Sequence, residues 1–193
     1  TRFFVLTALT KRRPFHAYKA LTELKYDLIE LGIDLEYFHA SEDRQETRDR
    51  VFDIIFNHLG EVGLDSLIVE KQKTNSALQV EDRFYPEMLG CLLRPVLKRL
   101  NLRNVSEVIL VTDRIPVQRK RRAVEKAVKK VLTDILPPGL RYQILHHDAK
   151  SSMDLQMVDY CNWAVYRKWD RGDRRSYAAI RRAIECEREF NPA

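Results

Sequence analysis

The stretch Glu107–Thr112, EVILVT, decides the fold class. Its four consecutive apolar residues match a strand that is buried on both faces, as the strands of parallel sheets are. The stretch runs directly into Asp113, and the spacing of apolar residues then predicts a helix over 117–136. A buried strand followed by a helix is the repeating unit of α/β folds, in which helices cover a mainly parallel sheet.

The rest of the chain repeats this alternation of strands and helices. Strands are expected over 3–10, 64–70 and 142–147, and helices over 18–31, 51–59, 84–100, from 152 onward and over 176–190. This order predicts an α/β fold with a mixed, mainly parallel central sheet flanked by helices. A length of 193 residues suits one core, so we expect residues 1–193 to form a single domain.

Composition narrows the setting. The chain has no apolar run long enough to span a bilayer, and its apolar stretch near Thr1 is too short for a signal peptide. Its three cysteines are odd in number and widely spaced, which indicates neither a disulfide framework nor a zinc site. We therefore expect a cytoplasmic protein. The chain carries no glycine-rich phosphate loop, GxSxG or CxxC motif, so kinase, Rossmann and serine-hydrolase functions lack support.

Asp159 stands out because the expected helix around it is apolar on nearly every side. At about 100° per residue, a narrow polar stripe crosses this helix, made of Ser152, Gln156, Asp159, Trp163 and Tyr166. Burying an unpaired carboxylate is costly. Two explanations stay open: a buried ion pair with an arginine of a neighbouring element, or a carboxylate that serves a functional site.

Asp113 is the second candidate carboxylate, because sites in open α/β sheets lie beyond the carboxyl ends of strands. The alternative is a plain loop aspartate before a helix, with Pro116 following it. If the strand over 142–147 lies beside EVILVT, the helix of Asp159 reaches the same edge. Two facing carboxylates repel, and a bound Mg²⁺ or Mn²⁺ relieves the repulsion and can activate water at a phosphodiester.

A basic segment begins close to Asp113. Arg114–Lys130 holds eight basic residues and one acid. We expect phosphate contacts, and therefore a nucleic-acid partner, from Arg119, Lys120, Arg121 and Arg122. The alternative is an ordinary solvated helix face.

Several segments together resemble one protein family. SSMDLQMVDYCNWAVYRK (151–168) resembles the Ser, Leu-Gln-x-x-Asp helix of the bacterial and phage domain-of-unknown-function 3800 family, and EVILVTDR resembles its strand ending in Asp. FFVLTAL resembles the family's second strand, and EYFHAS its Glu-x-His segment. The resemblance covers most of 3–168. It implies a ribonuclease H-like fold and a metal-dependent nuclease built from carboxylates.

The resemblance assigns roles to individual residues. It makes Asp113 and Asp159 the metal ligands, with Ser152 and Gln156 as supporting neighbours on the stripe. Glu36 or His39 would be the mid-chain member, although the sequence has Phe where the family has Glu.

The family opens with an Asp-Glu-Ser strand that has no counterpart in residues 1–193. Two hypotheses follow. The protein is a Mg²⁺- or Mn²⁺-dependent nuclease whose first strand precedes Thr1, or it is a non-catalytic nucleic-acid-binding or protein-interaction module of the same fold.

Overall fold

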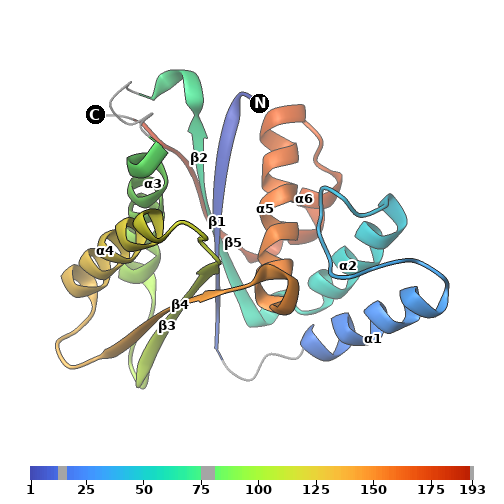
Figure 1. The fold of residues 1–193 in the computed structure, drawn as a ribbon, viewed down its shortest axis with the longest axis horizontal. Coiled ribbons are helices and arrows are strands. Elements are labelled where there is room, and N and C mark those ends of the chain that lie inside the picture. Colours follow the sequence, from blue (N-terminus) through green and yellow to red (C-terminus); the bar gives the residue numbers. More distant parts are fainter. Residues whose placement is uncertain (13–16, 75–80, 192–193) are drawn as a thin grey trace.

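The structure is a computed structural model, and it describes residues 1–12, 17–74 and 81–191. Within these ranges, strands form two separate sheets (Figure 1). The strands are β1 (Phe3–Lys11), β2 (Val62–Glu70), β3 (Glu107–Asp113), β4 (Arg141–His147) and β5 (Ile184–Glu189).

The larger sheet has the order β1-β2-β5, with β1 antiparallel and β5 parallel to β2. The smaller sheet pairs β3 with β4 in parallel. The expected α/β class with mixed and parallel strand pairing is therefore present. It is divided between two small sheets, whereas the sequence predicted one central sheet.

Helices occupy most of the positions where apolar periodicity predicted them. The α-helices are α1 (Ala17–Glu30), α2 (Gln45–Asn57), α3 (Glu81–Arg99), α4 (Gln118–Ile135), α5 (Met153–Arg171) and α6 (Arg175–Ile180). Short 3-10 turns are η1 (Leu59–Glu61), η2 (Lys71–Lys73), η3 (Ala149–Ser151) and η4 (Arg181–Ala183). No helix in the described ranges is both long and apolar enough to cross a membrane.

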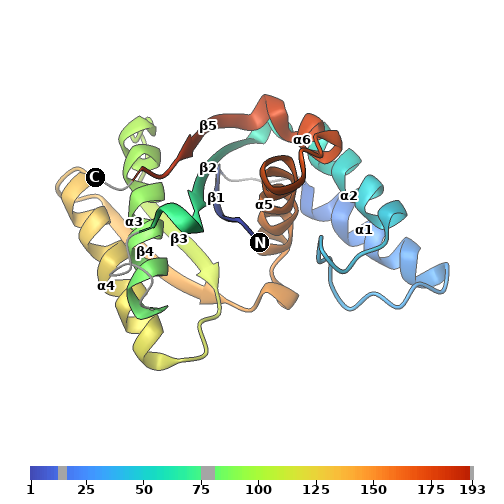
Figure 2. The same cartoon turned by 90° about the horizontal axis from the view of Figure 1, so that it is seen from above.

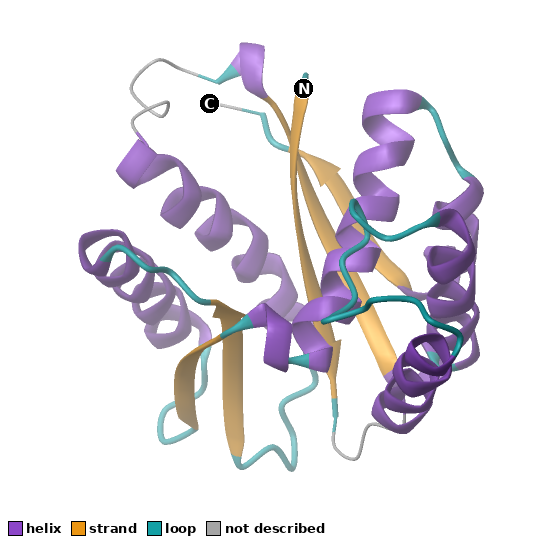
Figure 3. Ribbon diagram, turned by 45° about the vertical axis from the view of Figure 1, so that its right-hand side comes forward, coloured by secondary structure: helices purple, strands orange, loops and turns teal. Residues whose placement is uncertain are grey.

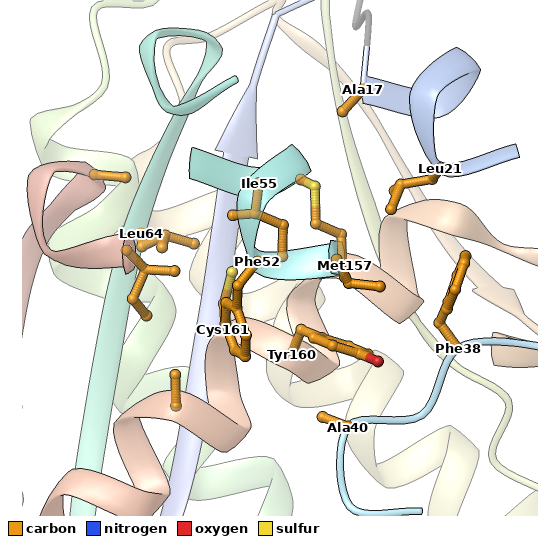
Figure 4. Close-up of a cluster of buried hydrophobic side chains, with 14 of the residues drawn as sticks. Ala17, Leu21, Phe38, Ala40, Phe52, Ile55, Leu64, Met157, Tyr160 and Cys161 are labelled. Carbon is orange, nitrogen blue, oxygen red and sulfur yellow. The ribbon is translucent and has the colours of Figure 1, made fainter. Parts of the chain in front are cut away.

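Alternate residues of the central strand β2 point to opposite layers of helices. Leu64 and Ile68 pack into the cluster that contains α1, α2, α5 and α6, whereas Leu67 and Val69 pack against α3. Figures 1 and 2 show the sheet between these two layers. The larger cluster is centred on α5, where Tyr160 and Cys161 are fully buried; the Tyr160 ring points toward Phe38 of the 36–44 loop, and Cys161 lies by Phe52 (Figure 4).

The β3–β4 pair has a helical layer on one face only. Val108 and Leu110 pack against the buried stripe of α4, which includes Val124 and Val128. Ile109, between them, is 41% exposed. The prediction that EVILVT is buried on both faces is therefore wrong for one face.

The C-terminal segment corrects a second prediction. The expected helix over 176–190 ends after η4, and Ile184–Glu189 forms β5 beside β2. Ile184 and Cys186 are half-buried, while Glu185 between them is exposed. This alternation suits a strand, and the edge of β2 supplies backbone partners that a short isolated helix lacks.

One buried ion pair gave no sequence signal. Asp65, in the middle of β2, is 2% exposed, and it accepts hydrogen bonds from Arg99 Nη1 at 2.7 Å and Nη2 at 2.6 Å. Arg99 ends α3, so the pair ties this helix to the central strand. The hydrogen-bonded carboxylate raises the pKa of Arg99.

Candidate functional site: a carboxylate pair beside a basic helix

Asp159 lies in the second turn of α5, which Ser152 caps by accepting a hydrogen bond from the Leu155 amide. Its side chain is 40% exposed. Asp159 Oδ2 accepts a hydrogen bond from the Ala40 amide at 3.0 Å and lies 3.7 Å from His39 Nδ1. The 36–44 loop thus covers one side of the carboxylate, and this role as a backbone acceptor was missed from the sequence.

The buried ion pair with an arginine is not what the structure shows. Among the described residues, no Lys or Arg side-chain nitrogen lies within 4.0 Å of the carboxylate of Asp159, and the same is true of Asp113. Of the two explanations for Asp159, the functional one therefore stays open.

The pKa of Asp159 is raised above its ordinary value. Burial is the main cause, and the Ala40 amide and His39 oppose it. The negative charges of Glu42 and Asp113 raise this pKa further. Asp113 makes the smallest of these contributions, and a shared site for Asp113 and Asp159 stays a prediction.

Asp113 ends β3 and is exposed. Its Oδ1 accepts hydrogen bonds from the Arg114 amide at 2.7 Å and the Ala149 amide at 3.2 Å. This oxygen connects the end of β3 to the start of η3. Asp113 therefore has a structural role in the loops that follow β3 and β4. This role uses Oδ1 alone, and within the described ranges Oδ2 accepts no hydrogen bond.

Gln156 explains how the polar stripe of α5 is held. The side chain is buried; its Oε1 accepts from the Phe38 amide at 3.1 Å, and its Nε2 donates to the carbonyls of Ala149 at 2.9 Å and Lys150 at 3.1 Å. Gln156 therefore clamps the 36–44 loop and η3 onto α5, close to both carboxylates. The supporting role at a metal site that the resemblance implied stays a prediction.

Glu36 forms no hydrogen bond or ion pair with Asp113, Asp159 or His39 among the described residues. Its exposed carboxylate pairs with Lys150 Nζ at 2.8 Å. Within the described ranges, no three His, Cys, Asp or Glu side chains form a group able to hold a metal ion. Of the predicted site residues, the structure places His39 beside Asp159, with 3.7 Å between Nδ1 and Oδ2.

Asp43 was missed from the sequence, where it sits in an ordinary acidic linker. Its Oδ2 accepts hydrogen bonds from the His39 amide at 2.9 Å and from the hydroxyl of buried Tyr160. Burial raises the pKa of Asp43. These bonds fix the backbone of His39, and hence the loop that covers Asp159.

The basic residues of α4 divide between two sides of the helix. Arg121 forms an ion pair with Glu125 at 3.2 Å, beside the buried stripe. The surface opposite that stripe, here named the outer basic face, consists of the exposed residues Arg119, Arg122, Lys126, Lys129 and Lys130. Of the four predicted phosphate contacts, only Arg119 and Arg122 belong to this face.

His146 connects α4 to the end of β3. Its Nδ1 lies 2.6 Å from Thr112 Oγ1, and its Nε2 lies 3.2 Å from Glu125 Oε1. Thr112 directly precedes Asp113. These two contacts therefore hold the N-terminal half of α4 close to the end of β3 at which Asp113 lies. His147 is exposed on the other side of β4.

Comparison of the chain with models of protein families, with curated proteins and with solved structures found no match.

Proposed function

We propose that the protein is a Mg²⁺- or Mn²⁺-dependent nuclease-like protein of ribonuclease H-like architecture. Asp113 and Asp159 would hold the cation, and the outer basic face of α4 would hold nucleic-acid phosphates. One observation carries the proposal. Asp113 and Asp159 come from distant segments that meet at Ala149, whose amide donates to Asp113 and whose carbonyl accepts from Gln156, one turn before Asp159; neither carboxylate has a Lys or Arg side-chain partner among the described residues.

The donor set suits magnesium. Mg²⁺ keeps several waters and is commonly bound by one or two carboxylates together with substrate phosphates. Each of the two aspartates uses one oxygen for a backbone amide, which fixes its orientation. A cation there would activate water and stabilise the leaving oxygen of a phosphodiester.

The position of the basic helix supports nucleic acid as the substrate class. The Thr112, His146 and Glu125 contacts attach α4 to the strand that ends in Asp113. A polyanion lying along the outer basic face would therefore pass near the carboxylate pair, and its affinity would depend strongly on salt.

A second candidate is a binding module of the same fold without catalysis. It is favoured by the lack, within the described ranges, of a third carboxylate or histidine that completes a metal group. The two candidates share the outer basic face and differ in whether a cation binds.

Thermal melts with and without MgCl₂ test the proposal. At a magnesium concentration of 100 times Kd, binding stabilises the folded state by about 2.7 kcal/mol. For a chain of this size, that corresponds to a rise in Tm of roughly 5–11 °C. Asp159→Asn and Asp113→Asn should each abolish the rise, whereas Asp53→Asn, at an exposed site on α2, should keep it.

Cleavage of labelled DNA and RNA, with Mg²⁺, with Mn²⁺ and with EDTA, separates the two candidates. Metal-dependent cleavage that Asp159→Asn abolishes supports the nuclease. A wild-type protein whose Tm is unchanged by either metal contradicts the metal site, and salt-sensitive binding without cleavage then favours the binding module.

A further inference from the structure

An open cavity lies at the carboxyl end of α5, where a short loop leads into α6 (Figure 3). Its volume is about 390 Å³, and its lining includes Lys168, Trp169, Gly172 and Arg174. A cavity of this size falls within the range of small-molecule sites. Asp159 lies in the second turn of α5 and Lys168 in its last turn, so roughly 13 Å of helix separates the cavity from the candidate metal site.

Glu187 of β5 holds two of the lining side chains in place. Its side chain is 10% exposed, and its Oε1 accepts hydrogen bonds from Lys168 Nζ and from Trp169 Nε1, the latter at 2.7 Å. Phe3 packs edge-on against the Trp169 ring, with 5.8 Å between the ring centroids. Trp169 is half-buried and lines the cavity. Its ring is therefore fixed before a ligand arrives, which lowers the entropic cost of binding.

The positive charge of the cavity comes mainly from Arg174. Lys168 also lines the cavity, but the Glu187 carboxylate balances its charge, and its Nζ lies 4.0 Å from the centroid of the Tyr177 ring. Arg174 is exposed, and its side chain forms no hydrogen bond or ion pair among the described residues. Each of the other arginines in 167–175 forms an ion pair with an aspartate: Arg167 with Asp173, Arg171 with Asp170 and Arg175 with Asp49. Arg174 is therefore the guanidinium of this segment that is left to bind an external anion.

Gly172 lies between Trp169 and Arg174 in the sequence and leaves the cavity open. It ends α5 in the left-handed conformation, with φ 68°, and its amide donates to the Lys168 carbonyl at 3.1 Å. A Cβ at this position would meet no atom within 4 Å. The turn therefore brings the indole and the guanidinium to one cavity without a side chain that fills it.

We propose that this cavity binds a nucleoside phosphate, with the base stacked on the Trp169 ring and the phosphate held by the Arg174 guanidinium. An indole stacks on the π-face of any base, and a guanidinium binds a phosphate through two parallel hydrogen bonds. A simple anion would leave the ring uncovered, and an apolar ligand would leave the arginine unpaired. The ring and the charge together fit a ligand that carries both an aromatic group and a phosphate. This site is independent of Asp113 and Asp159.

Isothermal titration calorimetry in EDTA tests the cavity without any contribution from a metal. Two ligands are compared on the unchanged chain: adenosine monophosphate, and ribose 5-phosphate, which lacks the base. We expect adenosine monophosphate to bind at least about tenfold more tightly, because stacking of a base on an aromatic side chain contributes at least that much affinity. Equal affinities for the two ligands would overturn the proposal, as would no binding of adenosine monophosphate.

Arg174→Gln should weaken the binding of adenosine monophosphate at least about tenfold, since the phosphate loses its charged partner. Arg181→Gln is the matched control, because Arg181 is also exposed, lies at the other end of α6 and is not among the residues that line the cavity. It should change the affinity by less than about twofold, since water and salt screen an exposed charge at that distance. Equal losses in the two variants would overturn the proposal, because general electrostatic attraction would then explain the binding.

A short single-stranded oligoadenylate separates the two sources of such a nucleotide. If Arg174→Gln weakens binding of the oligomer as well, the cavity receives a nucleotide of a strand. If the change weakens only adenosine monophosphate, the cavity receives a free nucleotide; either result supports the site, and a loss for neither ligand overturns it. The outer basic face can also attract the oligomer, so the loss caused by the variant is compared and not the total affinity.

Discussion

Replacing Arg99 with methionine should destabilise the fold severely, although Arg99 lies at the end of a helix. The change removes both hydrogen bonds to Asp65, whose carboxylate is 2% exposed in the middle of β2. Methionine keeps much of the apolar stem of the side chain. The loss therefore reports mainly the charge and its hydrogen bonds.

The expected cost follows from leaving a buried charge without its partner. Breaking a buried ion pair by removing one member typically costs about 3–5 kcal/mol. The side chain of Arg99 is 36% exposed, so water can reach the carboxylate from that side in the variant. We therefore expect the lower end, about 3 kcal/mol, which corresponds to a fall in Tm of roughly 6–12 °C.

Urea unfolding followed by tryptophan fluorescence measures this change. Arg94→Met is the matched control, because Arg94 lies on the same helix and pairs with Asp134 at 3.1 Å, with both side chains more than 40% exposed. Surface pairs of this kind contribute at most about 1 kcal/mol. The double variant Asp65→Leu with Arg99→Met should recover most of the loss, since no charge is then left buried.

Equal losses for Arg99→Met and Arg94→Met would refute this reasoning, because the burial of Asp65 would then carry no energetic consequence. A double variant that is less stable than Arg99→Met would refute it in a different way. It would mean that the packing of the side chains, and not the stranded charge, sets the cost.

Asp159→Asn should stabilise the protein in EDTA at pH 7, because the raised pKa of Asp159 means that folding disfavours its charged carboxylate. Thermal melts at several pH values should show this gain disappear as the pH falls below 3.8, the pKa of the residue in the unfolded chain, since the carboxyl group is then protonated in both states. Gln156→Leu removes the hydrogen-bond partner of the Phe38 amide, which is buried, and of the Ala149 and Lys150 carbonyls, so it should cost about 2 kcal/mol in urea unfolding, against little for exposed Gln143→Leu. The slope of log binding constant against log salt concentration, measured for DNA, should become less steep by about 4 when all five residues of the outer basic face are replaced by alanine. Arg121→Ala should leave this slope nearly unchanged.

The two candidate carboxylates could be picked out because the sequence signal of each is local. Asp159 breaks an apolar helical pattern, and Asp113 follows an apolar strand, so each stands out within a short window of sequence. The parallel pairing of β3 and β4, on which the prediction of a shared site rests, followed from the alternation of strands and helices. The Ala40 amide as the partner of Asp159 was beyond reach, because 119 residues separate them.

The local sequence pattern predicted a helix where the C-terminal segment forms a strand. Residues 184–189 contain apolar and charged residues in an order that fits a helix or a strand, and the edge of β2 decided the outcome through backbone pairing. The same limitation explains the ion pair of Asp65 with Arg99, which looks like a solvent-exposed charge in each segment when read separately.

The sequence by itself determined the positions of most helices and strands, because apolar spacing follows from which side of each element avoids water. Only the tertiary structure decided which strand edges meet, which loop covers Asp159 and which basic residues share the outer face of α4. These features depend on contacts between residues far apart in the chain, whose energies exist only once the elements pack together, so no short window of sequence encodes them.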